Sequence, residues 1–377
     1  MEALSLLRDR EASLIRWKQL WSLAALYASV IIGWIAYYRY QPKLLVQYNF
    51  TQFSFLLVVA QALIMVITPP IAGRLGDRYR FTQGHRIPIL SAGMSFTAMI
   101  FMAVAFTLIG NPGEVLRWIF PVLIILWLVG MSIFTSPALS TVELFAPIER
   151  MPYAMAILTI VSNVVYALEP IIVDIIDLLG APATFSVGGI AVFLSGYALK
   201  KNSIDLFKTK EANVLPKENS KQSRFGLIAS LGLGFGFAST MLFNVFPGKL
   251  QTNIGQLLGS ADGNALVSII LLLSAAISLP MSNVVSKFGI RRSYWWSLAV
   301  VIISVVVIVF VKDSATSLFT LIFIVGFTAM SVSALPLVLN ESSFEEKVFC
   351  VGVFYSAVAL PDGVVEIMMA YLPTIGF

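Results

Sequence analysis

Residues 54–90 read SFLLVVAQALIMVITPPIAGRLGDRYRFTQGHRIPIL, and this stretch decides the fold class. An apolar run near residues 51–72 is followed by a short basic turn, and a second apolar run begins near residue 88. A helix needs about 20 residues to cross a bilayer, and both runs have that length. Strands of transmembrane barrels are shorter and alternate in polarity, so the stretch indicates two membrane-spanning helices joined by a tight loop.

The same pattern extends over the whole chain. Of its 377 residues, 58% are hydrophobic and 12% are charged, with a mean hydropathy of +0.87. Soluble domains have about a quarter charged residues, so a soluble globular protein is excluded. We predict an all-α polytopic membrane protein with eleven spans, near residues 17–38, 51–72, 88–110, 117–141, 152–176, 183–199, 225–247, 264–286, 293–311, 316–340 and 347–371.

A polar stretch divides these spans into two groups. Residues 200–224 contain seven Lys and Arg residues and are predicted to form a solvated cytoplasmic linker. We therefore expect an N-terminal helix bundle at residues 1–199 with six spans. A C-terminal bundle at residues 225–377 would hold the other five.

Two sequence matches relate the halves. Pro70 lies seven residues before Asp77, and Pro280 lies seven before Lys287, each ahead of a basic turn. Repeated halves are typical of carriers, which bind substrate between the halves, so we infer an internal duplication. The second match pairs YALEPIIVDII at residues 166–176 with VALPDGVVEIM at residues 358–368.

The repeat also predicts a missing helix. Shifted by the distance between the repeats, the span at 183–199 would have its counterpart after about residue 375. That counterpart would need about 20 residues to cross the bilayer. The chain ends at Phe377. The second half is therefore expected to lack its twelfth helix.

Basic residues are divided unevenly between the two sides of the predicted bundle. With a cytoplasmic N-terminus, 20 of the 25 Lys and Arg residues fall on the cytoplasmic side. The positive-inside rule therefore predicts this orientation, in a plasma (inner) membrane. The same distribution accounts for the net charge of +5 without a nucleic-acid partner.

The chain resembles the major facilitator superfamily over nearly its whole length, through Gly73, Asp77, Arg78, Gly84 and Arg86. Residues 70–88 resemble the longer loop of glycoside-pentoside-hexuronide and sucrose-type cation symporters, and depart from it at residues 85–87. The resemblance implies two pseudo-symmetric six-helix halves and transport of a sugar. A bacteriochlorophyll-delivery branch has a similar loop, which leaves a second interpretation open.

The chemistry of this loop predicts a conformational latch. Gly73 permits close approach of two helix ends, and Asp77 can accept hydrogen bonds from helix N-termini or from arginines. Such a contact would hold one conformation of the protein, whereas the alternative is that the arginines only anchor the topology. The residues predicted to form the latch are Gly73, Asp77, Arg78, Arg80, Gly84 and Arg86.

Four carboxylates fall within apolar spans and are predicted to couple transport to an ion: Glu169, Asp174, Asp362 and Glu366. Acids inside a membrane are costly and usually mark an ion or proton path. Asp362 and Glu366 are four residues apart and so share a helix face. Pro170 and Pro361 are expected to allow kinks beside them. The alternative is that the acids only solvate helix ends.

The family's arrangement also implies candidate substrate contacts, which are Tyr27, Gln61, Trp127, Asn163 and Asn244. An aromatic ring with amide partners suits a neutral polyhydroxyl ligand. A phosphate or dicarboxylate exchanger is disfavoured, because no basic residue lies mid-membrane in the lining helices. A further aromatic group is interpreted as an interfacial belt: Trp34, Tyr37, Tyr38 and Tyr40.

These observations favour one function class over the others. A single cysteine, Cys350, and a single histidine, His85, argue against a bound metal or haem cofactor. The apolar spans hold no paired catalytic aspartates and no histidine, so an intramembrane enzyme is not expected. We predict a monomeric secondary carrier that moves a small solute, a sugar or glycoside, with a proton or sodium gradient. The alternatives are an efflux carrier for a hydrophobic compound and a non-transporting pigment-delivery or assembly factor.

Overall fold

The computed structural model describes residues 14–110, 113, 118–212, 222–255, 262–311 and 315–371. These residues form helices and connecting turns, with no strand among them. Ten of the helices are long and apolar enough to cross a membrane, and one further pair, bent by 58°, brings the number to eleven. The predicted all-α polytopic fold is confirmed.

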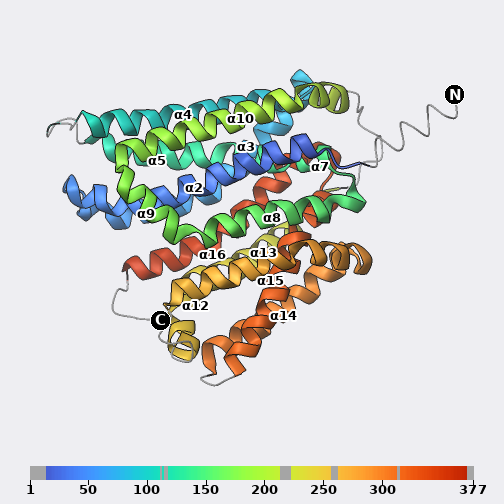
Figure 1. Ribbon diagram of the computed structural model, residues 1–377. Coiled ribbons are helices and arrows are strands. Elements are labelled where there is room, and N and C mark those ends of the chain that lie inside the picture. The colour runs from blue at the N-terminus through green and yellow to red at the C-terminus, as the bar shows by residue number, and fades with distance from the viewer. Residues whose placement is uncertain are drawn as a thin grey trace.

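The first half of the chain forms one side of the bundle, coloured blue to green in Figure 1. Its spans are α2 (Trp17–Gln47), α3 (Ser54–Gln83), α4 (Ile87–Ile109), α5 (Ile119–Ile133) with the short α6 (Thr135–Leu139) and α7 (Val142–Phe145), α8 (Met151–Ala167) with α9 (Glu169–Leu179), and α10 (Ala181–Ala212).

The second half, yellow to red, forms the other side. Its spans are α11 (Phe225–Thr240) continued by α12 (Phe246–Leu250), α13 (Gly263–Phe288), α14 (Ile290–Phe310), α15 (Ala315–Glu341) and α16 (Lys347–Tyr371). Two π-helical turns, Met241–Val245 and Gln251–Gly255, flank α12.

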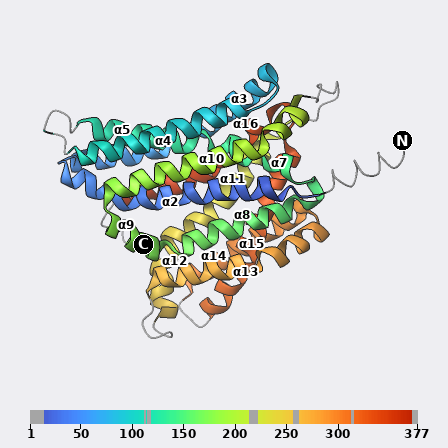
Figure 2. The same cartoon turned by 45° about the horizontal axis from the view of Figure 1, so that its top comes forward.

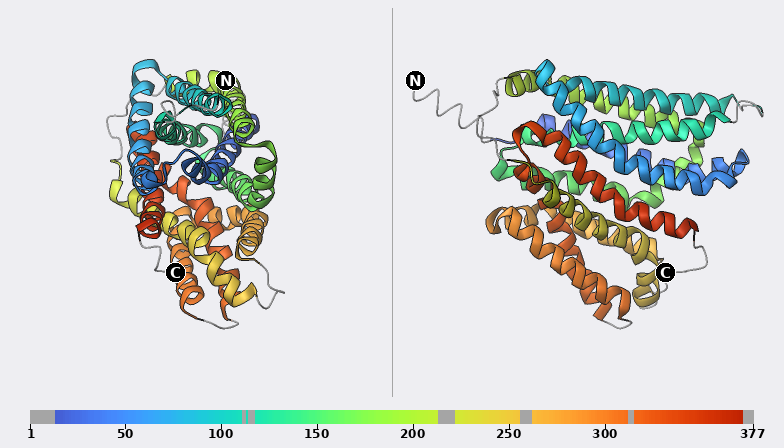
Figure 3. Two further views of the ribbon diagram at one scale, coloured as in Figure 1. Left: turned by 90° about the vertical axis from the view of Figure 1, so that its left-hand side faces the viewer. Right: turned by 180° about the vertical axis from the view of Figure 1, so that it is seen from behind.

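The two halves meet along two seams, which Figures 2 and 3 show from different sides. Helix α3 packs against α16 in one seam, and α8 packs against α13 in the other. The backbones of α3 and α16 approach closely because the glycines at their contact have no side chains. A Cβ at Gly73 would lie 2.5 Å from the Val348 carbonyl oxygen, and one at Gly352 would overlap the Pro69 carbonyl oxygen. Small residues allow such approach between membrane helices.

Helix α10 corrects the predicted linker. The helix continues to Ala212, although the linker was predicted to begin at residue 200. Leu206 and Phe207 are buried, so an apolar face persists between the lysines and holds this part in the bundle. The rest of the predicted linker, residues 213–221, and the last six residues, 372–377, lie outside the described chain.

The fifth span is broken and bent beside its proline as predicted, whereas the eleventh is one continuous helix. Helices α8 and α9 meet at Leu168 with a bend of 58°, just before Pro170. Proline has no N–H and clashes with the preceding turn, so it interrupts the helix there. Helix α16 instead continues through Pro361.

Helix α9 is attached to α2. The Tyr40 hydroxyl donates to the Ile176 carbonyl oxygen at 2.6 Å. Arg39 and Lys43 both form ion pairs with Asp177, the lysine at 3.0 Å. The second part of the fifth span, α9, is therefore tied to its own half of the molecule.

Candidate functional site

Asp77 of α3 caps the first turn of α16, in the other half. The Val348 N–H donates to Asp77 Oδ1 at 3.1 Å, and the Phe349 N–H donates to Oδ2 at 2.8 Å. The carboxylate is 6% exposed. The N–H groups in the first turn of a helix have no carbonyl partner within that helix, and the positive end of the helix dipole lies there, so both favour an anion. Asp77 thus joins the two halves, and its role as a latch that holds one conformation stays a prediction.

A buried ion triad lies beside this cap. The Arg86 guanidinium, fully buried, donates to Ser140 Oγ at 2.6 Å and to Glu143 Oε1 at 2.7 Å. Lys347, the first residue of α16, donates from Nζ to Glu143 Oε2 at 2.5 Å. Glu143 therefore links a cation from each half. Removing one charged side chain from such a buried group is costly, because the remaining partner then stays buried with an uncompensated charge.

Arg80 and Gly84 complete the contact. Arg80 donates to the Phe344 carbonyl oxygen at 2.9 Å, and its guanidinium lies 3.8 Å from the centre of the Phe344 ring. Gly84 ends α3 in the left-handed conformation, with φ of 77°, which glycine adopts at helix C-termini. Arg78 does not join the others, because its side chain is exposed. We call the end of the bundle that holds residues 73–86, 140–143 and 344–349 the latch end.

Two of the predicted coupling acids lie together on α16, far from the latch end. Asn244 Nδ2 donates to Asp362 Oδ1 at 2.8 Å, and Gln61 Nε2 donates to Glu366 Oε2 at 2.7 Å. Gln61 is on α3, so its bond to Glu366 crosses between the halves. In the described part of the chain, neither acid forms an ion pair.

The other two predicted acids lie on α9. Glu169 is in its first turn and is solvent-exposed. Asp174 is also exposed, and lies near Arg39 in the group around Asp177. The structure therefore does not bring Asp174 to the pair on α16.

The predicted substrate contacts fall in three environments. Gln61 and Asn244 hold the two acids, and Asn163 Nδ2 donates to Ser274 Oγ at 2.9 Å across the α8–α13 seam. Tyr27 is half-buried on α2. Trp127 is 2% exposed and stacks on Tyr37 at 4.5 Å inside the first half, so it does not lie at a seam.

The interfacial-belt interpretation of the first span is wrong for Tyr37 and Tyr40, which are buried. The Tyr37 hydroxyl donates to Gln61 Oε1 at 2.8 Å, and Gln61 Nε2 also lies 3.3 Å from the Tyr38 hydroxyl. Tyr40 bonds α9. Tyr37 faces the protein because the buried Gln61 needs hydrogen-bond partners, whereas Tyr38 is 44% exposed.

Sequence reasoning missed Glu143 as part of the latch. It lies two residues beyond the predicted span at 117–141, so it looked like an ordinary residue at a membrane surface. The available signal was its charge next to an apolar run, together with the buried arginine that it must neutralise.

Comparison with known proteins agrees with this architecture. The sequence matches the family profile described as Major Facilitator Superfamily over residues 22–364. A comparison with curated proteins gives no match.

Three solved structures share the fold at low sequence identity. A bacterial homologue of the iron transporter ferroportin, in an outward-facing state, has a TM-score of 0.68 and 14% identity, over 96% of this chain and 93% of its own. The human organic anion transporter MFSD10 (TETRAN) has a TM-score of 0.64 and 14% identity, over 95% and 93%. The proton:xylose symporter XylE has a TM-score of 0.63 and 12% identity, over 95% and 90%.

The similarity to these solved structures shows the fold alone, whereas the family profile matches the sequence of this chain. The profile covers nearly all of both halves, including the loop after α3 and Asp362 of α16. Members of this family are transporters and not enzymes. The chain belongs to the major facilitator superfamily.

Proposed function

We propose that this protein is a secondary active transporter that moves a small solute by alternating access, driven by a proton or sodium gradient. The observation that carries the proposal is the pair Asp362 and Glu366 on α16. Each accepts a hydrogen bond from a side-chain amide, and neither forms an ion pair within the described chain. Carboxylates of this kind inside a membrane mark ion or proton paths.

The position of the pair supports coupling to a change of conformation. Glu366 is joined to Gln61 across the α3–α16 seam, and the other end of the same seam carries the Asp77 latch. A bound proton or cation would change what Glu366 can accept from Gln61. Ion binding would thereby act on a contact between the halves, as alternating access demands.

For the solute we propose a sugar or glycoside. The support is the resemblance of residues 70–88 to sugar-type cation symporters. We place the protein in the plasma (inner) membrane as a monomer, with the latch end in the cytoplasm, on the distribution of its basic residues.

The test is flux in proteoliposomes made with the full chain. A panel of radiolabelled sugars and glycosides is offered under an imposed pH gradient, a sodium gradient or neither. We expect one gradient to drive accumulation of at least one solute above its equilibrium level. Flux that no gradient drives would contradict coupled transport. Gradient-driven export of a hydrophobic dye, with no sugar uptake, would support the efflux alternative, and absence of all flux from folded protein would support the delivery factor.

A further inference from the structure

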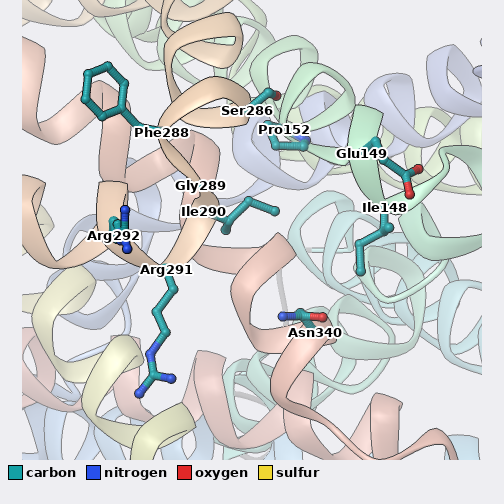
Figure 4. A pocket seen from close by; sticks show the side chains of 10 residues that line it. All are labelled: Ile148, Glu149, Pro152, Ser286, Phe288, Gly289, Ile290, Arg291, Arg292 and Asn340. Atoms are coloured by element: carbon teal, nitrogen blue, oxygen red, sulfur yellow. The ribbon is translucent and has the colours of Figure 1, made fainter.

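A basic pocket at the latch end is used by neither the latch nor the acid pair. Its volume is about 610 Å³, and it lies between the start of α8 and the loop from α13 to α14. Arg291 and Arg292 line it, and Figure 4 shows them on one wall with Glu149 on the opposite wall. A second pocket of about 380 Å³ is lined by the same two arginines with Trp295 and Trp296. The two arginines thus line two neighbouring pockets.

The two arginines form no ion pair in the part of the chain that the structure describes. Both side chains are exposed. Glu149, across the pocket, also forms no ion pair with a described residue. Arg291 and Arg292 both line this pocket, and guanidinium groups favour anions, phosphate above all because its geometry suits them.

The level of the pocket and its apolar rim indicate where this anion comes from. Helices α8, α13, α14 and α15 all begin or end here, which is the depth of lipid headgroups. Trp296 is 72% exposed and Phe288 is 71% exposed beside the arginines. Tryptophan is enriched at membrane interfaces, and basic pockets between membrane helices bind anionic headgroups.

The repeat within the chain explains why an external anion fits at the α8–α13 seam: this seam lacks the acidic residue that the α3–α16 seam has at the matching position. In the α3–α16 seam, Asp77 supplies the anion and Val348 an N–H. In the α8–α13 seam, the residue seven after the matching proline is Lys287, which cannot accept a hydrogen bond. Pro152, second in α8 as Val348 is second in α16, has no N–H. The second seam therefore has no latch of its own.

We propose that this pocket binds the headgroup of an anionic phospholipid, with its phosphate on Arg291 and Arg292. A headgroup hydroxyl, as in phosphatidylglycerol, donates to Glu149 on the opposite wall. The acyl chains lie against Phe288 and Trp296. The lipid thereby contacts both halves at the α8–α13 seam.

Native mass spectrometry of the detergent-solubilised full chain tests this site. Phosphatidylglycerol, phosphatidylethanolamine, phosphatidylcholine and inorganic phosphate are added separately. We expect phosphatidylglycerol adducts to exceed the others. The double variant Arg291→Gln with Arg292→Gln should bind phosphatidylglycerol about 30-fold more weakly. Both side chains are exposed, so the variant should unfold at the same temperature as the parent without lipid.

The matched control is Lys200→Gln with Lys201→Gln on α10, which removes two exposed cations outside the pocket. It should leave the phosphatidylglycerol affinity within about threefold, because only distant charge is lost. An equal loss in both double variants would mean general charge attraction and overturn the site. Equal binding of inorganic phosphate would place the ligand in solution, and phosphatidylethanolamine binding that Glu149→Gln abolishes would assign an amine headgroup. Either result would overturn the proposal.

Discussion

At the scale of single residues, the latch depends on a carboxylate that serves a helix in the other half. Asp77 accepts two backbone N–H groups at once, and both belong to the first turn of α16. Hydrogen bonds to a charged group contribute about 1.5–3 kcal/mol each to stability. One side chain can therefore shift the equilibrium between two conformations by an order of magnitude.

The first prediction concerns Asp77→Asn. The amide keeps the shape but loses the charge and one acceptor oxygen, so the latch end should open more often. We would measure maleimide labelling of Val348→Cys in a Cys350→Ser background, because Val348 is buried in the seam. Labelling should speed up about tenfold or more, corresponding to one lost charged hydrogen bond. Asp177→Asn, whose partners are Arg39 and Lys43, is the matched control and should label at the parent rate.

The second prediction concerns the acids. Asp362→Asn and Glu366→Gln should each abolish gradient-driven accumulation while exchange of solute persists, because the variants cannot release and rebind a proton or cation. Asp174→Asn is the control, since Asp174 is exposed and away from the pair on α16. Full gradient-driven accumulation in both test variants would refute the coupling role.

At the scale of helices, the α3–α16 seam depends on backbone contact. An added methyl group at Gly352 would meet the Pro69 carbonyl oxygen, which belongs to the backbone and cannot rotate away. Overpacking of this kind typically costs about 1–3 kcal/mol.

The third prediction is therefore that Gly352→Ala lowers the unfolding temperature of the purified protein and loosens the latch. Gly226→Ala on α11 is its control, because a Cβ there would meet nothing within 4 Å. Alanine also favours helix by up to about 1 kcal/mol over glycine, so the control should unfold no earlier than the parent. An unchanged unfolding temperature in Gly352→Ala would contradict the close seam.

At the scale of the whole molecule, the orientation in the membrane remains a prediction. Lys201 is exposed on α10 at the latch end. The fourth prediction is that Lys201→Cys, in a Cys350→Ser background, reacts with a membrane-impermeant maleimide only in inverted vesicles, since the basic end should face the cytoplasm. Labelling in right-side-out cells would reverse the assignment.

The spans and their number could be predicted from the sequence, because apolar length is a local property that the bilayer imposes. The sequence also pointed to Asp77 and Arg86, because their charges lie in a short loop between two apolar runs, with glycines at residues 73 and 84. Glu143 and Tyr37 could not, because their partners are more than 20 residues away in sequence and only packing brings them together. The same limit applies to Trp127, whose helix was predicted but whose direction of burial was not.

The two seams differ in how far they can stretch. Between α3 and α16 the backbones touch near Gly73, Gly352 and Gly363, and a peptide group does not compress or change rotamer. Between α8 and α13 the halves are joined through side chains such as Asn163 and Ser274, which can lengthen or exchange partners. We expect the α8–α13 seam to lengthen more readily than the α3–α16 seam when the halves move, so that the passage for the solute widens beside α8.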